Sequence, residues 1–158
     1  MKKYLKLVSA VLAVIGVIMM FFTQVSVKWE YPGHAESFAI SALVGGSTKY
    51  GGEIKNPVSS GLAGYILLGV AALIILVVAL VPYFKEHDML SAVVTGLAVV
   101  CAIVGCILIF LIRKNFADNN GPFKECIVGW AMIAGGSLGA LSALVGAVSI
   151  IFDINGSN

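Results

Sequence analysis

Charged side chains are scarce in this sequence: only 11% of its 158 residues are Asp, Glu, Lys or Arg, whereas 59% are hydrophobic. An ordinary soluble domain has about 25% charged residues, so the composition excludes a soluble globular protein. Charges are absent from four long stretches, which are 7–27, 56–84, 89–112 and 126–152. Each stretch is long enough to cross a hydrocarbon core about 30 Å thick. The sequence therefore predicts four membrane spans and leaves no room for a separate soluble domain.

The predicted spans must be helical, because every backbone amide in lipid needs a hydrogen-bond partner within the protein. We expect an all-α membrane protein with a single domain over 1–158, in which four transmembrane helices at about 5–25, 61–81, 89–112 and 127–152 form a bundle. Pro82 lacks an amide hydrogen and is expected to end the second helix. The run from Leu7 to Phe22 exceeds the usual apolar region of a signal peptide, and no Ala-x-Ala pattern follows it. The first helix is therefore expected to remain uncleaved.

The distribution of basic residues gives two opposing indications of orientation. Lys2, Lys3 and Lys6 cluster before the first span, which usually dominates insertion and favours a cytoplasmic N-terminus. With that orientation, however, the outside carries six basic residues against four inside, and Arg113 and Lys114 directly follow the third span. We predict a multi-pass protein of the cell membrane with both termini in the cytoplasm, which places the 26–60 connection outside the membrane.

The 26–60 connection is expected to contain β structure. Apolar residues alternate with polar ones from Val25 to Tyr31, a period that is typical of a strand with one apolar face, and Pro32-Gly33 then forms a turn. The segment 37–44 is a second candidate strand, although a short helix capped by Gly45 also fits it. A turn-rich piece at 47–50 could close a hairpin. We expect the membrane-proximal helix ends to cover the apolar face, and an exposed face that binds a partner is the alternative; the candidate interaction residues are Trp29, Tyr31 and Phe38.

Small residues recur at every fourth position of the fourth predicted helix, at Ala131, Gly135, Gly139, Ala143 and Ala147. Such a ridge lets two helix backbones approach closely, and packing of this kind drives the association of membrane helices. We expect the ridge to pack against the third helix of the same chain, because a short connection makes these helices antiparallel neighbours. Formation of a homo-oligomer through the ridge is the alternative.

Residues that carry chemistry are missing from the four uncharged stretches. Proton relays, ion sites and most coupled transporters need ionisable residues at membrane depth, so we expect none of these functions. The three cysteines have no metal or redox spacing, and His34-x-Glu36 offers only two metal ligands. No serine or cysteine has a recognisable base, so we predict no enzyme activity, no cofactor and no metal. The net charge of +2 forms no basic stripe, so nucleic acid is not an expected partner.

Three features of the chain stand out together: the basic start Met1-Lys2-Lys3, the loop sequence Leu43-Val44-Gly45-Gly46 and the glycine-rich last helix. This layout resembles that of small four-helix membrane proteins of low-GC Gram-positive bacteria. The architecture is also similar to that of the claudin-like group, which has a small extracellular sheet above four helices. The Gly-Leu-Trp and paired cysteines of that group are absent, and only Trp29 could correspond, so paracellular function is not carried over.

Two functions from different classes fit these features. We expect a non-enzymatic structural or protein-interaction role, in which the 26–60 loop is displayed outside the lipid bilayer to a membrane or envelope protein. The alternative is a subunit of a homo-oligomeric channel or passive transporter, in which serine-lined and glycine-lined helices would form a pore.

Overall fold

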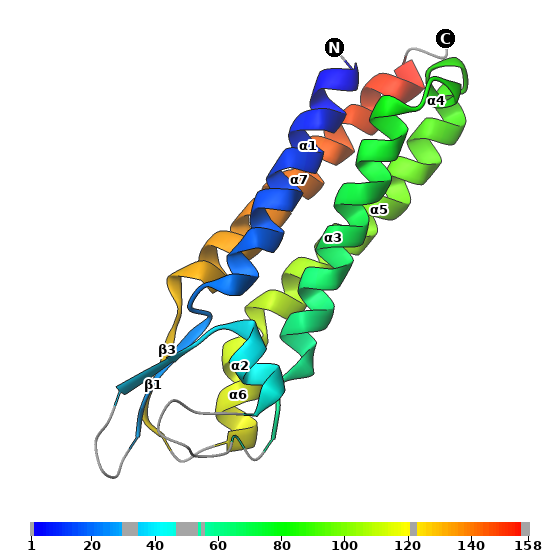
Figure 1. Cartoon of the computed structure of the whole chain (residues 1–158). Coiled ribbons are helices and arrows are strands. Elements are labelled where there is room, and N and C mark those ends of the chain that lie inside the picture. The colour runs from blue at the N-terminus through cyan, green and yellow to red at the C-terminus, as the bar shows by residue number, and fades with distance from the viewer. Residues whose placement is uncertain (1, 30–34, 47–53, 55, 121–122, 156–158) are drawn as a thin grey trace.

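The computed structural model describes residues 2–29, 35–46, 54, 56–120 and 123–155. Four long helices run side by side: α1 (Lys2–Ile18), α3 (Ser59–Leu80), α5 (Asp88–Phe110) and α7 (Trp130–Asn155) (Figure 1). With the 3-10 turn η1 (Met19–Phe21) added to α1, each is long and apolar enough to cross a membrane. Each helix packs against two others, in the closed order α1, α3, α5, α7. The prediction of four long apolar helices is confirmed.

The helix ends agree with the sequence where a charge or a proline marks them. α3 ends at Leu80, just before Val81 and Pro82, and α5 begins at Asp88. The first and last helices differ from the prediction. α1 ends at Ile18 instead of near residue 25, because the apolar run continues through η1 into a strand. α7 begins at Trp130 instead of 127 and continues to Asn155, so that it includes Asp153.

A three-stranded antiparallel sheet lies at the end of the bundle opposite the termini (Figure 1). Its strands are β1 (Val25–Trp29), β2 (Ala35–Phe38) and β3 (Phe123–Val128), and β1 lies in the centre. The predicted strand at the start of the 26–60 connection is confirmed over Val25–Trp29. The third strand was not predicted, since the sequence reading began the fourth helix at 127. The sheet therefore joins two connections that are far apart in the sequence.

The second candidate strand divides into two elements. Its first residues end β2, and the remainder forms the short helix α2 (Ile40–Gly45), the alternative that the sequence left open. Gly46 follows with φ of 69°, a left-handed conformation that side chains rarely adopt and that ends the helix. The hairpin expected at 47–50 lies outside the described residues.

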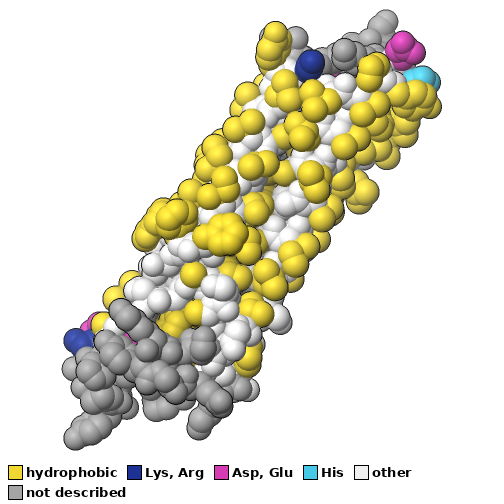
Figure 2. Space-filling model, in the orientation of Figure 1, with side chains coloured by type: hydrophobic (Ala, Val, Ile, Leu, Met, Phe, Trp, Pro, Cys, Tyr) yellow, Lys and Arg dark blue, Asp and Glu magenta, His cyan; other side chains and the backbone are white. Residues whose placement is uncertain are grey.

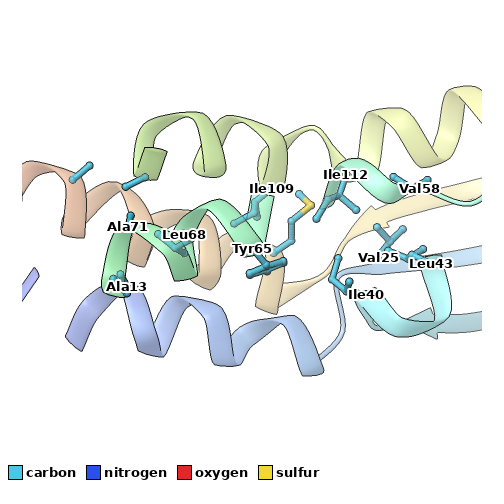
Figure 3. Close-up of a cluster of buried hydrophobic side chains, with 14 of the residues drawn as sticks. Ala13, Val25, Ile40, Leu43, Val58, Tyr65, Leu68, Ala71, Ile109 and Ile112 are labelled. Atoms are coloured by element: carbon cyan, nitrogen blue, oxygen red, sulfur yellow. The ribbon is translucent and has the colours of Figure 1, made fainter. Parts of the chain in front are cut away.

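The inner face of the sheet is covered by α2 and by α6 (Ile112–Asn120), a nine-residue helix that follows α5. Val25, Phe38, Ile40 and Leu43 are buried together there, and the rings of Phe38 and Phe116 of α6 lie 5.6 Å apart. Figure 3 shows that this cluster continues into the bundle through Tyr65 and Leu68. The cover thus comes partly from α6, which directly continues α5 at the membrane-proximal end, and partly from the separate short helix α2, which the expected cover of helix ends did not include.

The charged side chains that the structure describes lie toward the two ends of the bundle. On the face seen in Figure 2, hydrophobic side chains follow the whole length of the bundle, and the visible Lys, Arg, Asp and Glu side chains lie near its ends. One end carries the sheet; the other carries both termini and the short helix α4 (Tyr83–Glu86) that connects α3 to α5. This pattern is what a bundle surrounded by lipid requires.

Candidate functional site

The most polar site inside the bundle is an ion pair between the first and the last helix. Lys6 Nζ of α1 donates to Asp153 Oδ2 of α7 over 2.7 Å and to Ser91 Oγ of α5 over 2.6 Å. Ser91 Oγ also donates to Asp153 Oδ2 over 3.0 Å. Lys6 is 5% exposed, while Ser91 and Asp153 are fully buried. Three helices thus meet at a buried, hydrogen-bonded pair of opposite charges.

This ion pair corrects the expectation that the helices hold no ionisable residue inside the bundle. The positions of the charges in the sequence predict that Lys6 flanks the first span with two other lysines and that Asp153 lies just beyond the last span. Because α7 continues to Asn155 and α1 begins at Lys2, both residues are helical and face the other helices. Ionisable residues within membrane helices are costly and usually pair with one another, as these two do.

Further polar contacts join α1 to α7 deeper in the bundle. Ser9 Oγ donates to the carbonyl of Ser142, and Ser142 Oγ donates to the carbonyl of Ser9, both over 2.8 Å. Ser149 Oγ donates to the carbonyl of Gly146, one turn back on α7. These serines are buried within the bundle. They are therefore not on its outer surface, where a pore formed between several copies would need them.

A second polar centre fastens the sheet to the helices through Gln24. Its Nε2 donates to the carbonyls of Met19 and Phe22, and its Oε1 accepts a 2.8 Å hydrogen bond from the Tyr65 hydroxyl of α3. The backbone of Gln24 donates to the carbonyl of Phe38 and accepts from the amide of Gly129. Gln24 is fully buried. One side chain and its backbone thus connect η1, α3, β2 and the residue that precedes α7.

The small-residue ridge of α7 faces the centre of the bundle. Ala131, Gly135, Gly139 and Ala143 are buried, and Ala147 is half-buried. A Cβ at Gly135 would lie 2.7 Å from the Tyr65 hydroxyl of α3, and one at Gly139 would lie 2.6 Å from Cys106 Sγ of α5. The ridge therefore makes room for side chains of both α3 and α5, and not for α5 alone.

A close backbone approach between two helices was missed by sequence reasoning. It joins α3 to α5, where a Cβ at Gly64 would lie 2.8 Å from the carbonyl oxygen of Gly105 and a Cβ at Gly105 would lie 2.7 Å from that of Gly64. No spacing within one helix indicates which glycine of another helix will face it. The only indication in the sequence was the presence of a glycine in each helix, Gly64 in α3 and Gly105 in α5.

The three candidate interaction residues of the loop have different positions. Phe38 is 2% exposed and packs on Phe116, so its ring contributes to the core instead of the outer surface. Trp29 is the last residue of β1 and pairs in register with Phe123. Tyr31 lies outside the described residues. Of the other candidates weighed, Glu36 is buried in β2, and His34 also lies outside the described part.

The outward face of the sheet is formed by the alternate residues of the three strands. Lys28 of β1 lies between Ala35 of β2 and Glu125 of β3, and Ser26 lies between Ser37 and Ile127. Ser26 and Ser37 share a 2.9 Å hydrogen bond between their hydroxyls. Ile127 is 57% exposed. This face combines opposite charges, hydroxyl groups and an exposed apolar side chain, which is a chemistry suited to protein contacts.

The cysteines and acids offer little for catalysis or metal binding. Cys101, Cys106 and Cys126 are all free thiols. Burial raises the pKa of the Cys126 thiol, and the nearby Arg113 charge partly offsets this, so the reactive thiolate is disfavoured. Within the described ranges, no group of three or more His, Cys, Asp or Glu side chains is placed to hold a metal ion.

Comparison with known protein families, with curated proteins and with solved structures gives no match for this chain.

Proposed function

We propose that the chain is a non-enzymatic integral membrane protein that holds a small sheet at one membrane surface for binding to another membrane or envelope protein. The observation that carries this proposal is the construction of the sheet. Two separate connections supply its strands, α2 and α6 fill its inner face, and the outward face described above remains accessible. A fold that only needed to join helices would not require such a fixed platform.

The attachment of the sheet to the helices supports the same proposal. The hydrogen bonds of Gln24 fix β1 to η1 and to α3, and Arg113 Nε of α6 donates to the backbone carbonyl of Cys126 in β3. Hydrogen bonds thus tie β1 and β3, two of the three strands, to the helices. A platform held this way loses little conformational freedom on binding, which favours affinity. From the N-terminal lysine cluster, we assign the sheet to the outer surface of the cell membrane.

Site-specific photo-crosslinking in cells tests the proposal. A photoreactive phenylalanine analogue replaces Ile127 on the outward face, and a matched control replaces Leu144, which is 64% exposed on the apolar surface of α7. We expect one discrete heterologous protein adduct from position 127 and none from position 144. The adduct should disappear with Lys28→Glu, and exchanging the charges with Lys28→Glu and Glu125→Lys controls for net charge.

Other outcomes would contradict the proposal. The absence of any adduct at position 127 in a correctly inserted protein would remove the partner-binding role. An adduct formed only between copies of the chain, together with ion conductance in liposomes, would favour the channel alternative. Recovery of the protein in the soluble fraction of broken cells, and not in the membrane fraction, would overturn the integral membrane assignment itself.

A further inference from the structure

A pocket of about 210 Å³ lies beside the buried ion pair, at the end of the bundle that carries the termini. Side chains of α1, α3, α4, α5 and α7 line it, so it forms only when the whole bundle is assembled. Its lining combines two lysines and two aspartates with an apolar part, and it includes Lys3, Lys6, Ala79, Phe84, Asp88 and Asp153. The site lies at the level where lipid headgroups would surround an inserted bundle.

Among the lining side chains that the structure describes, the charges are balanced. Lys3 and Lys6 of α1 contribute two ammonium groups, while Asp88 of α5 and Asp153 of α7 contribute two carboxylates. A simple anion would lie beside both aspartates, and a simple cation would lie beside both lysines, so neither is favoured over water. A small ligand that carries one charge of each sign can place each beside its opposite.

The ion pair itself can contribute to binding. Lys6 Nζ has two described acceptors, Ser91 Oγ and Asp153 Oδ2, whereas an ammonium group has three hydrogens. A ligand phosphate in the pocket can accept the third. Lys3 is exposed and lines the same pocket, so it can supply a second ammonium donor. The carboxylates can accept from a ligand group that has N–H or O–H hydrogens, and of these an ammonium group also matches their charge.

The pocket has room for a small ligand. Its volume of about 210 Å³ admits a phosphate joined to a small ammonium group. The chemistry of the ammonium then decides between ligands, because a trimethylated ammonium offers the carboxylates no N–H donor and a primary ammonium does.

We propose that this pocket binds a zwitterion in which a phosphate is joined to a primary ammonium, as in the headgroup of phosphatidylethanolamine. The phosphate lies toward Lys3 and Lys6, and the ammonium lies toward the carboxylates. Ala79 and Phe84 form an apolar part of the lining, beside which the first carbons of a lipid could lie. The inference rests on the proposed membrane insertion but not on the proposed partner, because the pocket and the sheet lie at opposite ends of the bundle.

The test measures lipid retention by the purified full chain in detergent, using native mass spectrometry. Phosphatidylethanolamine, phosphatidylcholine and phosphatidylglycerol with identical acyl chains are supplied in turn, and soluble phosphoethanolamine is added as a competitor. We expect phosphatidylethanolamine to be retained about tenfold better than the other two, since one hydrogen bond to a charged group changes affinity by about tenfold or more. Asp88→Asn and Lys3→Gln should each abolish most of this preference, and the melting temperature of each lipid-free variant shows whether it is still folded.

Matched controls are Glu125→Gln and Lys28→Gln, which remove the same charges at the sheet end and should leave the preference intact. Equal retention of the three lipids, or a preference that survives both pocket variants, would overturn the inference and leave the pocket filled by water. Full competition by soluble phosphoethanolamine at low concentration would assign the same chemistry to a free zwitterion, and its failure would assign it to the lipid. A negative lipid result with an intact adduct at position 127 would refute this inference alone.

Discussion

The sharpest structural demand in the bundle is the space at Gly139. This residue is buried on α7, and a Cβ added to it would lie 2.6 Å from Cys106 Sγ and 3.2 Å from Leu68 Cδ1. Ordinary contacts between such atoms need about 3.5–4.0 Å, so the facing helices or side chains must move by about 1 Å even for alanine. Leucine adds three more carbons to a position that has no room for the first.

The expected cost follows from overpacking of a close-packed interior. Gly139→Ala should lower the free energy of unfolding by about 1–3 kcal/mol, and Gly139→Leu should cost more. The matched control is Val148→Leu on the same helix, where the side chain is 44% exposed and extra carbons find space. Replacement of both Gly135 and Gly139 by leucine should prevent folding. Melting temperatures and reversible unfolding in detergent measure these differences.

A double-mutant cycle shows whether the named contact causes the loss. Because Cys106 Sγ is the atom nearest to the added Cβ, Cys106→Ala should remove much of the penalty of Gly139→Ala. The coupling energy should fall within the range of about 0.5–3 kcal/mol that contacting residues show. If Gly139→Leu melts like the parent chain and like Val148→Leu, the ridge does not face the bundle centre and the arrangement of α7 is wrong.

Three other perturbations test separate parts of the structure. Asp153→Asn leaves the buried ammonium without its counter-ion and should cost about 3–5 kcal/mol in detergent unfolding, whereas replacing both members of the pair with Met and Leu should restore most of the loss. Tyr65→Phe should cost about 1–3 kcal/mol by leaving its buried glutamine partner without a donor, and an unchanged melting temperature would argue against the link between sheet and bundle. In a chain whose native cysteines are alanine, Asp118→Cys should react with an impermeant maleimide on intact cells and Glu86→Cys should not; the opposite labelling would invert the membrane orientation.

The sequence predicted the helices best where side-chain chemistry marks their ends. α3 and α5 agree closely with the uncharged stretches, because Pro82 ends one and Asp88 begins the other. α1 was predicted too long because Met19 to Val25 is as apolar as the helix that precedes it. Hydrophobicity reports burial in both a helix and a strand, so it does not locate the change from one to the other.

The sheet shows a different limit of the sequence. The alternation from Val25 to Trp29 predicted β1 because one face of that strand is buried. Its partner β3 was missed, although Glu125 and Ile127 alternate with the less exposed Cys126 and Val128. The two strands are about a hundred residues apart, and their pairing depends on how four helices bring both connections to one end. Nothing within either segment specifies that neighbour.

The buried ion pair is the feature that the sequence could have indicated but that charge counting concealed. Charges at the ends of apolar runs usually lie in water, and Lys6 was therefore grouped with its two neighbouring lysines. Its helical position indicates otherwise: Ser9 and Ala13, three and seven residues further along, lie on the same face and are both buried.

Asp153 has the same relation to its own helix. Ser149, four residues earlier, is fully buried, and Asp153 continues that face by one further turn. In each helix a face of small and polar residues leads directly to a charge, and the two charges are opposite in sign. A stripe of this kind on one helix and a complementary stripe on another predict a buried pair, since neither charge could face the bundle alone at an acceptable cost. The pair thereby specifies that the first and last helices are neighbours, and it places polar groups where a headgroup pocket can form only in the assembled bundle.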